Sequence, residues 1–103
     1  MILESPYAGR VTFNTQYARR CLLDSLGRFE APIASHLLYT QVLNDMDPLH
    51  REAGIAAGLA WAAVCDYAVF CIDHGWSPGM LAARAYYDAT GVNYILREIG
   101  TPL

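Results

Sequence analysis

The apolar run at residues 67–72, Tyr-Ala-Val-Phe-Cys-Ile, constrains the fold of this chain more than any other feature. A short, unbroken run of this kind is typical of a parallel strand that is buried on both faces. Parallel strands need long connections, which are usually helices. Two helix starts flank the run, because Asp47-Pro48 and Ser77-Pro78 each combine an N-cap residue with a first-turn proline. The pattern therefore predicts strands that alternate with helices.

The same alternation continues through the rest of the chain. In order, we expect a strand at residues 1–5, a helix at about 14–27, a strand at 31–35, a short helix at 36–43, a helix at 48 to about 63, a strand at 67–72, a helix at 78 to about 90 and a strand at 93–96. Gly27 and Gly91 are suitable helix ends. Pro32 lacks an N–H group, which places the second strand at a sheet edge.

Strands joined by helical crossovers form a parallel sheet with right-handed connections. We therefore expect an α/β fold of three layers, with a four-stranded parallel sheet in the order 2-1-3-4. A chain of 103 residues has room for one core, so residues 1–103 are expected to form a single domain. A domain of this size buries only about 65% of its unfolded surface alone, and we also expect a homo-oligomer.

The charge balance excludes several classes of partner. The formal net charge is −3 and the chain has no lysine, so it lacks the basic face that double-stranded DNA or an anionic membrane requires. The absence of lysine also excludes Schiff-base chemistry. The first residues lack the charged and apolar regions of a signal peptide. The longest apolar stretch, residues 53–65, is shorter than the ~20 residues that span a bilayer. We expect a cytoplasmic protein.

No metal or cofactor is expected. Cys21, Cys65 and Cys71 form no CxxC pair, and their odd number argues against a disulfide framework. No two histidines have the spacing of metal ligands on one element. The motifs GxSxG, HExxH and GxGxxG are missing as well. We expect the cysteines to be reduced, buried thiols.

A ligand site is expected where the strand order reverses, beyond the carboxyl ends of the first and third strands. The loops at this place are residues 6–9 and 73–80. Tyr7 offers a ring that can stack on a base or sugar. The N–H groups of Gly79 and Met80, beside Ser77 at a helix start, can hold an anionic edge. The alternative is that Ser77 is only a helix cap and Gly79 is incidental.

Further polar residues follow the strand ends. Ser5 ends the first strand, His36 follows the second and Asp73 ends the third. The alternatives are structural: a core histidine and a loop-capping aspartate. Alternation along the first strand leaves open whether Glu4 points to the site or into solvent, and His50 is expected to face solvent. A triad of Ser5, His36 and Asp73 can be drawn, but sequence supplies no geometry for it.

Several segments resemble a group of small proteins that are common in phage and bacterial genomes. These segments are Ile2-Leu-Glu-Ser-Pro-Tyr-Ala-Gly9, Asn14-x-x-Tyr17-Ala-Arg19, Glu30 to Gln41 and Asp73-x-Gly75-x-Ser77-x-Gly79-Met80. The group looks like compact, distant relatives of nucleoside 2-deoxyribosyltransferases. The resemblance covers nearly the whole chain. It implies a flavodoxin-like parallel sheet, frequent oligomers and the transfer of deoxyribose between bases through a glutamate nucleophile.

One departure from the family pattern bears on activity. The resemblance places the nucleophile a few residues after the Ser/Gly loop, at Ala83 or its neighbours Ala82 and Arg84. An alanine cannot attack an anomeric carbon. The closest carboxylate along this helix, Asp88, lies more than one turn farther on. Arg84 can instead balance phosphate charge or face solvent.

The leading hypothesis is therefore a domain that binds a nucleotide or nucleoside and lacks the glycosyl-transfer nucleophile. Its expected ligand-binding residues are Ser5, Tyr7, His36, Asp73, Ser77, Gly79, Met80 and Arg84. In a phage, such a protein could sequester a nucleotide signal. The first alternative is a nucleoside deoxyribosyltransferase or N-glycosidase with a displaced carboxylate: Glu4, Asp73 or one from a neighbouring subunit. The second is a structural oligomerisation module that pairs through the small-residue helix around Trp61.

Overall fold

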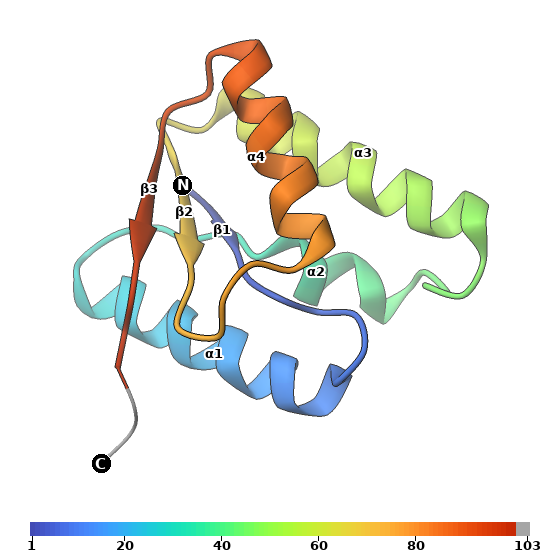
Figure 1. The fold of residues 1–103 in the computed structure, drawn as a ribbon, viewed down its shortest axis with the longest axis horizontal. Helices are drawn as coiled ribbons and strands as arrows, with labels where there is room; N and C mark the ends of the chain where they lie inside the picture. The colour runs from blue at the N-terminus through green and yellow to red at the C-terminus, as the bar shows by residue number, and fades with distance from the viewer. Residues whose placement is uncertain (101–103) are drawn as a thin grey trace.

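The computed structural model describes residues 1–100 as an α/β fold with a parallel sheet (Figure 1). The strands are β1 (Ile2–Glu4), β2 (Ala68–Cys71) and β3 (Tyr94–Arg97). They lie side by side in that order, and Val69 at the centre pairs with Leu3 on one side and Ile95 on the other. All of β2 is buried, which confirms that residues 67–72 contain a central strand.

The helices begin and end largely where capping residues place them. They are α1 (Val11–Gly27), α2 (Ser35–Leu38), α3 (Pro48–Val64) and α4 (Pro78–Thr90), with a 3-10 turn, η1 (Tyr39–Gln41), directly after α2. The Asp47 side chain accepts from Leu49 N–H at the start of α3, and Gly91 ends α4 in the left-handed region at φ 78°. Within residues 1–100, no helix has both the length and the apolar character that crossing a membrane requires.

The sheet has three strands and not the expected four, because residues 31–35 do not form one of its strands. Residues 31–35 meet the sheet only through an isolated parallel bridge between Ile33 and Ile2. Because Ile2 also pairs with Ala68, this bridge lies on the outer side of β1, where the order 2-1-3-4 places the second strand. Pro32 has no N–H to donate, and α2 already begins at Ser35. The extended segment is therefore too short to form a ladder.

Helix α1 begins at Val11, earlier than the expected start at Asn14. The buried Asn14 side chain turns back to the loop after β1 and donates to the carbonyl oxygens of Tyr7 at 3.0 Å and Ala8 at 3.3 Å. Asn14 therefore holds the loop that carries Tyr7 instead of capping the helix.

Apolar side chains cover both faces of the sheet. One cluster joins β1 and β2 to α3 and α4 and contains Ile2, Ala62, Ala68, Phe70, Met80, Ala83 and Tyr87. The other joins the opposite face to α1 and contains Leu3, Tyr17, Cys21, Ala34, Val69 and Cys71. Alternate residues of β1 and β2 thus belong to different clusters, and Figure 1 shows α1 apart from α3 and α4. The three cysteines are free; Cys21 and Cys71 are buried and Cys65 is partly buried.

Candidate ligand-binding site

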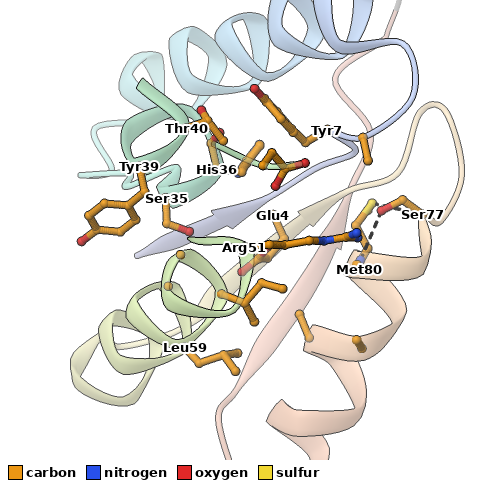
Figure 2. Close-up of a pocket in the computed structure, with 18 of the residues that line it drawn as sticks. Glu4, Tyr7, Ser35, His36, Tyr39, Thr40, Arg51, Leu59, Ser77 and Met80 are labelled. Carbon is orange, nitrogen blue, oxygen red and sulfur yellow. Dashed lines mark hydrogen bonds between the residues drawn. The ribbon is translucent and has the colours of Figure 1, made fainter. Parts of the chain in front are cut away.

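A cavity of about 400 Å³ opens beside the carboxyl end of β1 (Figure 2). Five parts of the chain line it: the end of β1 with the following loop, α2 with η1, the segment between η1 and α3, residues 50–59 of α3, and the loop residue Ser77 with residues 78–86 of α4. They meet because β1 and β2 are parallel neighbours, so the segments that follow the two strands emerge at one edge of the sheet. The volume lies in the range of small-molecule sites.

The sequence-selected residues divide into two groups. Those that line the cavity are Ser5, Tyr7, His36, Ser77, Gly79 and Met80. Asp73 and Arg84 lie outside the lining. Tyr7 and Ser77 come from loops far apart in sequence and meet at one cavity, because the two loops follow adjacent parallel strands.

Ser5 and His36 form a hydrogen-bonded pair in the cavity wall, with 2.7 Å between Ser5 Oγ and His36 Nε2. Burial lowers the pKa of the His36 imidazole to about 4, so the ring is neutral at physiological pH. Its Nδ1 atom is buried and has no hydrogen-bond partner within residues 1–100. Buried nitrogens of this kind are uncommon in proteins. His36 is thus a neutral hydrogen-bonding group in this wall.

Asp73 serves the fold and does not line the cavity. Its carboxylate accepts from Tyr17 OH in α1 and from the backbone N–H groups of Ile99 at 3.0 Å and Gly100 at 2.9 Å. Burial alone would raise the pKa of Asp73, but these hydrogen bonds together lower it. The carboxylate therefore ties α1 to the segment after β3. It is not the third member of a triad with Ser5 and His36.

Arg84 is also occupied elsewhere. Its Nε atom donates to Tyr94 OH at 3.1 Å, and its guanidinium lies 4.8 Å from the centre of the Trp76 ring. Ala83 does line the cavity. Ala82 lines it as well, so of the three positions that the resemblance offers for the nucleophile only Arg84 lies outside the lining.

The first turn of α4 has fewer free backbone donors than the sequence suggests. Met80 N–H donates to Ser77 Oγ at 3.2 Å, and Pro78 has no N–H group. Gly79 N–H has no acceptor within residues 1–100. A Cβ atom at Gly79 would meet only Ser77 Oγ, at 4.0 Å. Gly79 is therefore the open donor of this turn, and Ser77 is a true helix cap.

Glu4 lines the cavity, which settles the question that strand alternation leaves open. It lies on the same side of β1 as Ile2, which packs against α3 and α4. Tyr87 OH of α4 donates to Glu4 Oε1 at 2.6 Å. Burial raises the pKa of Glu4, and the hydrogen bond from Tyr87 offsets part of the rise. A carboxyl group and Ala83 therefore share one cavity.

The sequence analysis misses Arg51. This residue lies in the first turn of α3, and its side chain extends across the cavity towards Ser77 and Met80 (Figure 2). Its neighbour His50, which was expected to face only solvent, lines the cavity as well, and His50 Nδ1 accepts from Asn44 N–H at 2.9 Å. Exposed charges at a helix start are usually solvated. Only the position of α3 beside the cavity distinguishes Arg51, and no sequence signal reports that position.

A family model for a domain of unknown function, DUF7768, matches residues 1–97. The chain belongs to this family. The match includes all residues that line the cavity, so the cavity is part of the DUF7768 domain. Neither a curated protein nor a solved structure matches this DUF7768 chain.

Glycines let two helices of the DUF7768 domain approach closely behind the cavity wall. A Cβ atom at Gly58 of α3 would lie 2.6 Å from Ser35 Oγ of α2, and one at Gly54 would lie 3.3 Å from Leu43 Cδ1. Both glycines line the cavity together with Ser35 and Leu43. Gly54 and Gly58 thus pack within the chain, whereas Ala53, Ala56, Ala60 and Ala63 of α3 stay exposed.

The groups around the cavity can bind a polar ligand in several ways. Tyr7 provides an aromatic ring, Ser5 and Glu4 provide hydrogen-bonding oxygens, and Arg51 provides a cation. Among residues 1–100, no three histidine, cysteine or acidic side chains gather where they could hold a metal ion. The chemistry available from these side chains is hydrogen bonding, stacking and charge pairing.

Proposed function

We propose that this domain binds a nucleotide or nucleoside in the cavity and does not transfer its sugar. The observation that carries the proposal is that Ser5, Tyr7, His36 and Gly79, each selected for ligand chemistry, line one cavity of about 400 Å³. A cavity of this volume suits a ligand of nucleotide size. Tyr7 stacks on the base or sugar, the Ser5–His36 pair holds polar groups, and Gly79 N–H meets an anionic edge.

The resemblance to nucleoside 2-deoxyribosyltransferases supports this ligand class. By this resemblance, the sheet and its helices form a three-layer, flavodoxin-like architecture. Residues 31–35 then correspond to an edge strand that is shortened in this chain. The expected nucleophile position is Ala83, which lines the cavity without a carboxylate. A domain that binds the ligand but does not transfer its sugar agrees with the absence of a carboxylate at this position. As the biological role we propose sequestration of a nucleotide signal in the cytoplasm, as by a phage protein.

Thermal unfolding with a panel of nucleosides and nucleotides tests the proposal. At least one member should raise the Tm, and the rise should grow with ligand concentration above the Kd. Tyr7→Ala should reduce the rise, whereas Arg19→Gln, a change on the exposed side of α1, should not. No rise with any member would contradict the proposal and favour a structural oligomerisation module.

A second function is favoured by one observation, the shared cavity of Glu4 and Ala83. Glu4 would be the displaced carboxylate of a deoxyribosyltransferase or N-glycosidase. The ionised carboxylate would form an ester bond to the anomeric carbon while the N-glycosidic bond breaks and the base leaves with the bonding electrons. The raised pKa of Glu4 opposes this role, because it keeps more of the carboxyl group protonated. For this reason we rank transfer below binding.

Incubation with deoxynucleosides and a free base separates the two functions. Base exchange or release of free base that is lost in Glu4→Gln would establish the second function. If the wild type catalyses neither reaction but shows a ligand-dependent rise in Tm, binding remains as the function.

A further inference from the structure

The cavity contains a cation with no internal partner. Arg51 forms no ion pair within residues 1–100, whereas Arg28 pairs with Asp24 at 2.8 Å and Arg97 pairs with Glu30 at 2.7 Å. The Arg51 guanidinium also has no hydrogen-bond acceptor among the described residues and crosses the cavity from α3 towards α4 (Figure 2). An extended, unpaired guanidinium at a cavity is available to an anionic group of a ligand.

The groups near Arg51 add donors to the same side of the cavity. His50 Nδ1 accepts from Asn44 N–H at 2.9 Å, which leaves Nε2 as the ring nitrogen that can donate. Gly79 N–H is open on α4. Asp45 also lines the cavity but forms no ion pair with Arg51. This side of the cavity is therefore rich in donors.

The wall that carries His36 adds further polar groups to the cavity lining. His36 lines the cavity beside Ser5, and its buried Nδ1 has no partner among residues 1–100. Glu4 in the same lining has a pKa raised by burial, and its carboxyl group accepts from Tyr87 OH. The cavity thus has hydrogen-bonding groups at one wall and a free cation at the other.

We propose that the cavity prefers a nucleoside phosphate ester to the corresponding nucleoside, and that Arg51 binds the phosphate. This inference rests on the proposed nucleotide function and names the part of the ligand that determines affinity. A phosphate monoester offers several acceptor oxygens and no obligatory donor, which matches the planar, two-pronged guanidinium. The base and sugar then lie towards Tyr7, Ser5 and His36.

Isothermal titration with matched pairs of ligands tests the inference. Each common ribonucleoside and deoxyribonucleoside is compared with its own 5′-monophosphate, and inorganic phosphate is included as a probe without base or sugar. For the pair that binds, the monophosphate should bind at least about tenfold more tightly, as expected for charge-assisted hydrogen bonds. Inorganic phosphate alone should bind more weakly than the monophosphate.

Two variants assign the preference to Arg51. Arg51→Gln should bring the affinities of nucleoside and monophosphate close together, and Arg51→Lys should keep part of the difference because the charge remains. Arg19→Gln removes the same charge from an exposed position on α1 outside the cavity and should keep the full difference. Arg51 is itself exposed, so these variants should fold like the wild type, which circular dichroism checks.

The outcomes separate this inference from the proposed function. Equal affinity of the wild type for nucleoside and monophosphate overturns the inference and leaves nucleotide or nucleoside binding in place. An undiminished difference in Arg51→Gln overturns the role of Arg51. Equal binding of inorganic phosphate and monophosphate reveals a general anion site and overturns the preference for a nucleoside ester. Binding of no panel member overturns both proposals.

Discussion

Single residues determine how two of the helices end. After α1, Phe29 lies in the left-handed region at φ 61°, with Phe29 N–H donating to Leu26 O at 3.0 Å and Glu30 N–H to Ser25 O at 3.2 Å. This hydrogen-bond pattern closes many helices and favours glycine at the left-handed position. The side chain of Phe29 is also 99% exposed. Phe29 therefore adds strain without burying apolar surface.

Replacement of Phe29 by glycine should stabilise the fold. We expect Phe29→Gly to raise the free energy of unfolding by about 0.5–1 kcal/mol, because relief of the left-handed strain exceeds the added entropy of the unfolded chain. Gly91→Ala is the matched control, since Gly91 ends α4 at φ 78° and should lose about 1 kcal/mol. Urea unfolding measures both changes. A destabilised Phe29→Gly variant would show that Phe29 makes a stabilising contact.

The pair of Glu30 and Arg97 should make stability depend on acid pH. The Arg97 hydrogen bond is the main cause that lowers the pKa of Glu30 from 4.5 to about 2, and Tyr67 and Ser25 also donate to this carboxylate. Because the folded-state pKa is the lower one, Glu30 stabilises the fold above about pH 4.5. This contribution is lost as the pH falls from about 4.5 to about 2.

Urea unfolding at pH 6 and pH 3 checks this dependence. The loss of stability between the two pH values should be smaller in Glu30→Gln than in the wild type. Glu52→Gln, on an exposed part of α3 without an ion pair, should keep the wild-type loss. An equal loss in Glu30→Gln would rule out Glu30 as a source of acid sensitivity.

At the scale of elements, the sequence predicts what local chemistry controls. Asp47-Pro48 and Ser77-Pro78 place the starts of α3 and α4, and the apolar run places β2. The strand expected at residues 31–35 fails because its length depends on where α2 begins, which is a matter of packing. Residues 98–103 carry no sequence pattern, and Ile99 and Gly100 are held by the distant residues Asp73 and Arg20.

The contact between α2 and α3 should be sensitive to one methyl group. Gly58→Ala places a Cβ atom 2.6 Å from Ser35 Oγ and 3.3 Å from Ser35 Cβ, so the Ser35 side chain or α2 must shift and the free energy of unfolding should fall by about 1–3 kcal/mol. Ligand affinity should fall as well, because both residues line the cavity. Ser35→Ala should recover part of the loss, and Gly27→Ala, which meets nothing within 4 Å, should not destabilise. An unaltered Gly58→Ala variant would contradict this packing.

At the scale of the whole molecule, the place of the site could be predicted but its full set of side chains could not. Parallel strands bring the loops of Tyr7 and Ser77 to one edge, which the strand order alone indicates. Asp73 is hydrogen-bonded to Tyr17 of the distant helix α1, and Arg84 to Tyr94 of the next strand, β3, so neither lines the cavity. Arg51 belongs to the cavity lining because α3 lies beside the cavity. Helix faces depend on packing that one sequence does not encode locally.

Self-association is expected from the apolar surface of the chain. Leu23, Leu26 and Phe29 at the end of α1 are 72%, 55% and 99% exposed, and Ile95 and Leu96 of β3 are each 46% exposed. Leu23 and Leu26 are three residues apart and therefore neighbours on the helix surface, and an exposed apolar patch commonly marks an interface. Sedimentation velocity should therefore detect species larger than the 11.4 kDa chain at micromolar concentration. A single species of that mass at every concentration would contradict the expectation.

The central claim is that the cavity beside β1 binds a nucleotide or nucleoside. Titration of the ¹⁵N-labelled protein with the panel member that raises the Tm most, followed by heteronuclear NMR, locates the ligand directly. The amide signals of Tyr7, His36 and Gly79 should shift together and saturate at a common Kd, while those near Phe29 should stay unchanged. Saturable shifts that avoid the cavity, or no saturable shift with any member of the panel, would contradict the claim.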